Sequence, residues 1–176
     1  MSHVPAVTQQ RADHAEAIIA RLKTHASPVL SNYPVELAYL YGSIARKRPL
    51  PPSDIDVALL LSDEPPSSYE RLVLEVEIQA ALEDASQLSS LDVRSINQAP
   101  IMVQGTVVQE GILLYSRDKD TRVAFEVAVR KRYFDYLPTR ERMERAFLRH
   151  IRERGLRHGQ TEDSNIHSKQ SKWLSE

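Results

Sequence analysis

The chain begins with a helical pattern and then changes to short apolar runs that predict strands. Apolar residues recur every three or four positions over residues 6–26, which predicts an amphipathic helix that ends at Ser27-Pro28. Apolar runs bounded by turn residues then predict four strands. They cover residues 36–41, 54–61, 90–96 and 112–115.

Two helices are predicted between these strands. Residues 69–85 fit both an alternating and a helical pattern, and their length and their content of Glu, Ala and Leu favour a helix. A short helix is predicted over residues 100–110, with Asn97 as a candidate N-cap and Gly111 as its end.

The last part of the chain is predicted to be helical up to Arg154. Two helices, over residues 118–136 and 140–154, are expected on either side of a break at 137–139, which reads Leu-Pro-Thr. Residues 155–176 are polar and lack periodicity, so we expect a disordered tail there.

This order of elements predicts an α/β (α+β) fold in which helices flank a small mixed β-sheet. The segment 69–85 stands between two predicted strands and is long enough to be a helical crossover between parallel strands. We expect a single domain over residues 1–154, because a chain of 176 residues is long enough for one hydrophobic core.

The composition is that of a soluble globular protein, with 41% hydrophobic and 27% charged residues. Cysteine is absent, which excludes disulfides, thiolate catalysis and cysteine-ligated zinc. No run approaches the roughly 20 apolar residues that span a bilayer, and the N-terminus lacks the pattern of a signal peptide. We therefore expect a cytoplasmic protein with no membrane-bound part.

The net charge of −1 hides an uneven distribution. Residues 130–158 hold ten Lys and Arg against four Asp and Glu, a net charge of +6, so the rest of the chain carries −7. Such a basic helical segment is typical of a partner surface or a phosphate-facing wall, and equally of a solvated helix face. At this point all three interpretations stay open.

Two carboxylates stand two residues apart at the start of the second predicted strand. Side chains alternate across a strand, so Asp54 and Asp56 are expected on the same face, with Cα atoms about 6.5 Å apart. Carboxylates so placed can hold divalent cations together with the phosphates of a nucleotide. Because Asp-x-Asp alone is often only a solvated strand end, the residues around it decide between the two interpretations.

A Gly-Ser turn lies ten residues before these carboxylates. Gly42 permits a tight turn and a close approach of the backbone to a ligand. Ser43 then opens a short helical segment whose N–H groups and hydroxyl could hold a phosphate. Arg46 follows and could neutralise phosphate charge.

The Gly-Ser turn, the ten residues after it and the Asp-Ile-Asp of residues 54–56 together resemble the signature of the polymerase β-like nucleotidyltransferase superfamily. The short chain resembles its minimal branch, the MNT-type nucleotidyltransferases, which are often the antitoxin of HEPN–MNT toxin–antitoxin pairs. The resemblance covers about residues 36–116 and implies that fold, with extra C-terminal helices. The family often has a glycine soon after the turn, where this chain has Lys47.

The resemblance also implies roles for the candidate residues. The catalytic residues, which would hold two Mg²⁺ ions, are Asp54, Asp56 and Asp92. Asp92 is the natural third acid because it lies in the next predicted strand; its alternative interpretation is an exposed residue paired with Arg94. The residues that would bind the phosphates of ATP are Gly42, Ser43 and Arg46.

By the same resemblance, the chain would be a Mg²⁺-dependent nucleotidyltransferase that moves AMP from ATP to a hydroxyl. The expected acceptor is a Tyr of a cognate HEPN ribonuclease toxin, so the protein would act as an antitoxin, alone or in a homo- or hetero-oligomer. Direct binding of nucleic acid is not expected. Two alternatives stay open: a non-catalytic antitoxin that blocks its toxin by binding, and an aminoglycoside-like transferase with a small-molecule acceptor.

Overall fold

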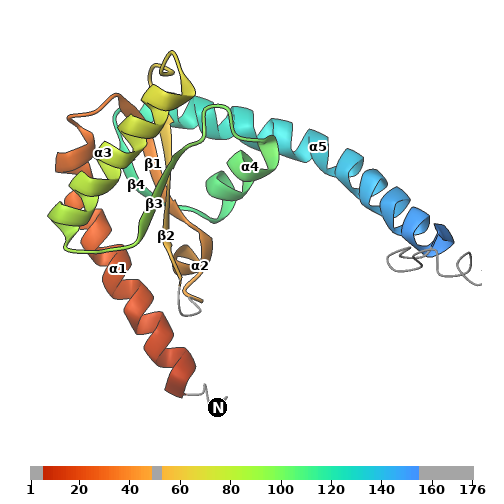
Figure 1. The fold of residues 1–176 in the computed structure, drawn as a ribbon, viewed down its shortest axis with the longest axis horizontal. Coiled ribbons are helices and arrows are strands. Elements are labelled where there is room, and N and C mark those ends of the chain that lie inside the picture. The colour runs from red at the N-terminus through yellow and green to blue at the C-terminus, as the bar shows by residue number, and fades with distance from the viewer. Residues whose placement is uncertain (1–5, 49–52, 155–176) are drawn as a thin grey trace, which may run out of the picture. The chain divides into compact units, whose positions relative to one another are not determined.

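The computed structural model describes residues 6–48 and 53–154, in which four strands form one mixed sheet with helices on both faces (Figure 1). In chain order the elements are α1 (Ala6–Leu30), β1 (Val35–Tyr41), α2 (Gly42–Ala45), β2 (Ile55–Leu61), α3 (Ser68–Ser86), β3 (Leu91–Ser95), α4 (Ile101–Glu110), β4 (Ile112–Ser116) and α5 (Lys119–Arg154). None of the described helices is long and apolar enough to cross a membrane. The α/β class with a small mixed sheet is confirmed, and the predicted tail 155–176 lies outside the described residues.

The four strands lie in the order β3-β2-β1-β4. β1 pairs antiparallel with β2 and with β4, whereas β2 pairs parallel with β3. A parallel pair needs a long crossover, and α3 supplies it. The helical interpretation of residues 69–85 is therefore correct.

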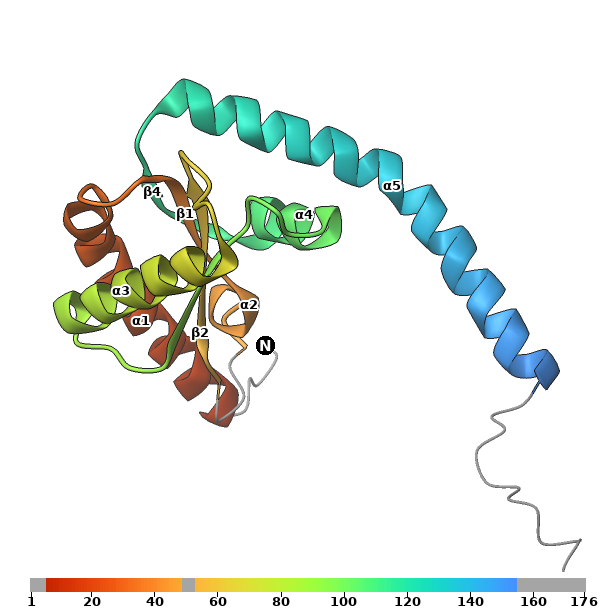
Figure 2. The same cartoon turned by 45° about the horizontal axis from the view of Figure 1, so that its top comes forward.

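β2 is apolar almost throughout because both of its faces are covered. On one face Ile55, Val57 and Leu59 pack in a cluster that includes residues of α1 and α3. On the other face Ala58 packs in a second cluster that includes Val107 of α4 and Phe125 of α5. Figure 2 shows α4 on the side of the sheet opposite to α1 and α3. This packing fixes the position of the strand that carries Asp56.

The chain divides into two compact units within α5, between Tyr136 and Leu137. In the first unit, α5 packs on α4 so closely that a Cβ on Gly105 would overlap the ring of Tyr133. Tyr133 therefore has a packing role at this point. The second unit contains the rest of α5, where the exposed large apolar residues are Met143, Phe147 and Leu148.

Both helix ends that were predicted at prolines are wrong. α1 continues through Pro28 to Leu30, and α5 continues through Pro138 to Arg154. A proline inside a helix costs about 3 kcal/mol, through a lost hydrogen bond and a steric clash. In α1 the last turn is retained because Leu30 is fully buried and because Asn32 Nδ2 donates to the Pro28 carbonyl at 2.8 Å.

In α5, local hydrogen bonds after Pro138 support the helix. Arg142 Nε donates to the Pro138 carbonyl at 3.3 Å, and Arg145 Nη2 lies 3.6 Å from Glu141 Oε2 one turn further on. Side-chain pairs at this spacing each stabilise a helix by a few tenths of a kcal/mol. The predicted pair of C-terminal helices is therefore a single helix in the structure.

Asn97 has a different role from the predicted one. α4 begins at Ile101, and its N-cap residue, Pro100, offers no side-chain cap. Leu61 N–H instead donates to Asn97 Oδ1 at 2.9 Å, and Asn97 Nδ2 donates to the Leu61 carbonyl at 2.9 Å. The Asn97 side chain thus pairs with both backbone groups of Leu61, as the backbone of a neighbouring strand would, and holds the β3–α4 loop against the end of β2.

Replacement of Asn97 by alanine is expected to lower the free energy of unfolding by about 1–3 kcal/mol, because both partly buried backbone groups of Leu61 lose their partner. Urea denaturation measures this change. Gln98→Ala, at the exposed neighbouring position, is the control and should stay within about 0.5 kcal/mol of wild type. Equal stability of all three proteins would show that the Asn97 bridge contributes nothing.

Candidate active site

Three side chains form one row across the sheet, at the end of β1 and at the beginnings of β2 and β3. Tyr41 is the register partner of Asp56, and Asp56 is the register partner of Asp92. Residues in register on neighbouring strands point to the same face and are about 5 Å apart. The structure therefore brings Asp56 and Asp92 side by side.

Asp54 lies at the rim of this row. Asp54 stands directly before β2, which begins at Ile55, so the expectation that Asp54 and Asp56 share a face stays a prediction. Its side chain is exposed, yet its charge is close enough to act on Asp56. Asp54 therefore belongs with Asp56 and Asp92 to one group of acids, which we call the acidic row, and it lies on the solvent side of that group.

Among the acids that the structure describes, Asp56 is the one whose pKa is raised. Burial raises its pKa, and the negative charges of Asp92 and Asp54 raise it further, while Arg46 has the opposite effect. Burial also raises the pKa of Tyr41, and the charges of Asp56 and Asp92 raise it further, while Arg94 has the opposite effect. The group therefore holds more negative charge than its own surroundings neutralise, which is the condition that a bound cation relieves.

Gly42 allows the Asp56 carboxylate to lie directly against the backbone of the turn. Its φ of +76° is in the left-handed region that favours glycine. A Cβ added at Gly42 would overlap Asp56 Oδ2. The Gly-Ser turn and the acidic row are thus packed against each other, although ten residues separate them in sequence.

The other predicted phosphate-binding residues lie at the same end of the sheet. Ser43 is in the four-residue helix α2, directly after Gly42. Arg46 follows α2, and its charge reaches Asp56. Its Nη1 is paired with Glu110 Oε2 at 2.9 Å, but both side chains are about half exposed, so this pair is weak and a phosphate could replace Glu110.

Lys47 occupies the place where the resembled family often has a glycine, and it adopts the backbone conformation that glycine favours. Its φ is +55°. For a residue with a Cβ this conformation costs roughly 1 kcal/mol. Lys47 Nζ lies 2.7 Å from Glu16 Oε1 of α1, an exposed pair that ties the turn to the helix.

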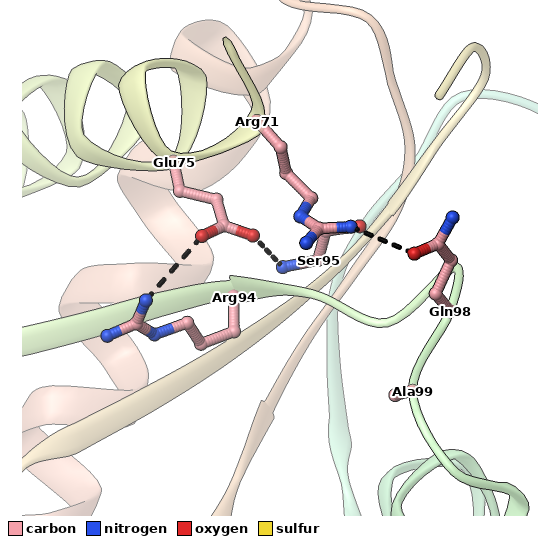
Figure 3. Close-up of a pocket in the computed structure, with 6 residues that line it drawn as sticks. All are labelled: Arg71, Glu75, Arg94, Ser95, Gln98 and Ala99. Carbon is pink, nitrogen blue, oxygen red and sulfur yellow. Dashed lines mark hydrogen bonds and ion pairs between the residues drawn. The ribbon is translucent and has the colours of Figure 1, made fainter. Parts of the chain in front are cut away.

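Arg94 lies beside a cavity that the sequence did not reveal. Arg94 Nε donates to Asp92 Oδ1 at 2.8 Å, so the ion pair considered as the alternative for Asp92 exists. Arg94 also lines a cavity of about 330 Å³ between the first part of α3 and the β3–α4 loop (Figure 3). The residues around this cavity are Arg71, Glu75, Arg94, Ser95, Gln98 and Ala99. The spacing of two residues along a strand was the only sequence signal for the pair.

The acidic row suits a divalent cation by its chemistry. Hard cations take carboxylate oxygens, and the raised pKa of Asp56 reports uncompensated negative charge. Within the described ranges, however, no three acidic or histidine side chains converge closely enough to form a ready-made metal site. One of the acids in register, Asp92, is turned toward Arg94 instead.

Several solved structures share this fold. A toxin–antitoxin crystallised with AMP-PNP is 22% identical over 72% of this chain and 98% of that chain, with a TM-score of 0.57. The toxin–antitoxin MntA-HepT is 22% identical over 72% and 97%, with a TM-score of 0.53, and a structure from Shewanella oneidensis is 20% identical over 72% and 96%, with a TM-score of 0.53. At identities this low, the similarity shows only that the fold is shared. A comparison with curated protein sequences gives no match.

A family match covers more than half of the chain. Residues 25–120 match the family described as Polymerase beta, Nucleotidyltransferase. This range contains the whole sheet, the Gly-Ser turn and all three candidate acids. The chain therefore belongs to the polymerase beta nucleotidyltransferase family.

Proposed function

We propose that this protein transfers AMP from ATP to a hydroxyl group of a protein partner, and that the partner is a HEPN ribonuclease toxin which the transfer silences. The observation that carries the proposal is the packing of Gly42 against Asp56, in register with Asp92. This packing brings the turn to which we assign phosphate binding against the acidic row, inside a nucleotidyltransferase domain.

The proposed roles follow from the position of each side chain. Gly42, Ser43 and Arg46 bind the phosphates of ATP beside the acidic row. Asp54, Asp56 and Asp92 hold Mg²⁺, two ions by the family's pattern. When bound, Mg²⁺ stabilises the charge that develops on the phosphates and lowers the pKa of the attacking hydroxyl.

The transfer itself is a single displacement. The acceptor oxygen forms a bond to the α-phosphorus, and the bond from that phosphorus to the bridging oxygen breaks, so pyrophosphate leaves with the electron pair. Asp92, on the edge strand β3, is the acid to which we assign the acceptor proton. The product is an AMP ester of the acceptor hydroxyl.

The choice of a toxin as acceptor is supported by two observations. The structures that share this fold include toxin–antitoxin pairs, one of them with AMP-PNP. In addition, the second unit of this chain exposes the apolar side chains of Met143, Phe147 and Leu148 on a basic helix, a combination typical of a surface that binds another protein. We therefore propose a tyrosine hydroxyl of the toxin as the acceptor.

Intact-protein mass spectrometry tests the proposal. This protein is mixed with ATP, Mg²⁺ and the product of the adjacent gene, with the double variant Asp54→Asn/Asp56→Asn as control. The partner mass should rise by whole AMP units with the wild-type protein only. A stable complex without any mass change would instead support a non-catalytic antitoxin, and the absence of both would leave a small-molecule acceptor as the remaining candidate.

Asp56→Asn is expected to abolish transfer and yet to stabilise the fold near pH 7. The folded protein raises the pKa of Asp56, so the ionised carboxylate destabilises the fold above the pKa of the unfolded chain. The gain in Tm should disappear as the pH falls below the ordinary range of an aspartate, because Asp56 is then neutral in both states. Thermal unfolding at several pH values measures this, with Asp63→Asn in an exposed loop as the charge-matched control.

Gly42→Ala is expected to reduce transfer by at least about 100-fold, because the new methyl group displaces the Asp56 carboxylate. Stability should also fall, by about 1–2 kcal/mol from the left-handed φ and further from the overlap. The same change in an Asp56→Ala background removes the overlap and should cost less. Equal losses of stability in the two backgrounds would show that Gly42 and Asp56 are not coupled.

A further inference from the structure

Arg94 lies between two carboxylates that belong to different parts of the fold. Its Nε is 2.8 Å from Asp92 Oδ1, in the acidic row, and its Nη1 is 3.6 Å from Glu75 Oε2, on α3. Figure 3 shows Glu75 above Arg94 on the wall of the cavity. The present geometry favours Asp92, since only that contact has hydrogen-bond length.

The contact with Asp92 competes directly with cation binding. A carboxylate that donates its lone pairs to a metal cannot offer the same lone pairs to a guanidinium. Arg94 occupies Oδ1, one of the two oxygens with which Asp92 could share a cation with its register partner Asp56, and its positive charge would repel that cation. The Arg94 guanidinium therefore stands in for part of the positive charge of the cation.

Glu75 is already positioned to pair more closely with Arg94. The Glu75 side chain is only 9% exposed, and its Oε1 accepts the N–H of Ser95 at 2.8 Å, which fixes the carboxylate in place. Its Oε2 points toward Arg94 and has no contact closer than 3.6 Å with that residue. The cavity of about 330 Å³ beside them leaves room for a guanidinium, and the Arg94 side chain is 55% exposed, so it can move.

We propose that Arg94 is a resident counter-charge that moves from Asp92 to Glu75 when the acidic row takes up a divalent cation, so that the Arg94–Asp92 pair and the bound cation exclude each other. The inference rests on the proposed function only in taking Asp92 as a cation ligand. Arg94 acts through Asp92 and is therefore a positioning residue. Without a cation it limits the repulsion in the row, and with a cation its weak pair with Glu75 becomes the main one.

Binding of Mn²⁺ to the full chain without nucleotide, measured by electron paramagnetic resonance, tests the exchange. Arg94→Gln removes the competitor and should tighten Mn²⁺ binding about twofold to fivefold, the range for a partly exposed ion pair. Glu75→Gln keeps an acceptor for Ser95 N–H but removes the charge that receives Arg94, so binding should weaken by a similar factor. Both variants are first checked for wild-type thermal unfolding.

Two controls separate the exchange from a general effect of charge. Arg71→Gln removes the other arginine of the cavity, which pairs with Gln98 and Glu64 rather than Asp92, and should change Mn²⁺ affinity by less than about twofold. In the double variant Arg94→Gln/Glu75→Gln, loss of Glu75 should have no further effect, because no Arg94 remains to be received. A separate, additive effect of Glu75→Gln in the double variant would overturn the proposal.

Nuclear magnetic resonance of the arginine Nε–Hε groups follows the movement itself. The Arg94 signal, assigned by its loss in Arg94→Gln, should shift during a Mg²⁺ titration with the same dissociation constant as the cation. An unchanged Arg94 signal at saturating Mg²⁺ would overturn the exchange. The variant Asp56→Asn distinguishes a failure of the proposed function from a failure of the Arg94 exchange. If Asp56→Asn binds Mn²⁺ as wild type does, the proposed function is contradicted. If Asp56→Asn loses Mn²⁺ binding but Arg94→Gln binds as wild type does, only the role of Arg94 is contradicted.

Discussion

The contact between the Asp56 carboxylate and the backbone of Gly42 is the constraint on which the rest of this structure depends. It requires a residue without a side chain at a left-handed position, directly before α2. It also requires β1 and β2 to keep their register, because a shift by one residue would turn Asp56 to the opposite face. The fold satisfies the second requirement by packing both faces of β2 into apolar clusters.

This arrangement places charge where the fold itself gains nothing from it. Asp56 is partly buried beside two other acids, and its raised pKa shows that its ionised form is disfavoured there. A row selected only for stability would avoid such a cluster, since like charges in register on neighbouring strands repel. Such a cluster is typical of a site for a positively charged ligand, and its negative charge also explains why an arginine is found against Asp92 in the structure.

The parts of the molecule that were predictable are those encoded by neighbouring residues. The Gly-Ser turn and Asp-Ile-Asp lie within one strand–turn–strand segment, and the strand pattern alone places Asp56 beside the turn. The helix ends at Pro28 and Pro138 were mispredicted because tertiary burial and local side-chain bonds outweigh the cost of a proline. The role of Asn97 escaped prediction for a related reason, since its partner, Leu61, is 36 residues away and is recognised through backbone groups.

Contacts between distant parts of the chain also explain why Glu75 and Arg71 were not recognised as neighbours of the site. Both lie on α3, and only the crossover geometry brings that helix to the edge strand β3. An exposed edge strand needs protection against pairing with other chains, and α3 provides it, because Glu83 accepts the N–H of Leu91 and Glu75 accepts that of Ser95.

Asp92 lies on this edge strand, and in the proposed function an acceptor molecule has to reach it. The proposed function therefore requires the strand to be open to the acceptor on its sheet face and closed to other strands along its edge. Glu75 meets both needs, since one oxygen caps the edge and the other faces Arg94, the partner of Asp92. Protection of the edge and the proposed exchange at Arg94 thus depend on one carboxylate, which links the proposed function of the row to the position of α3.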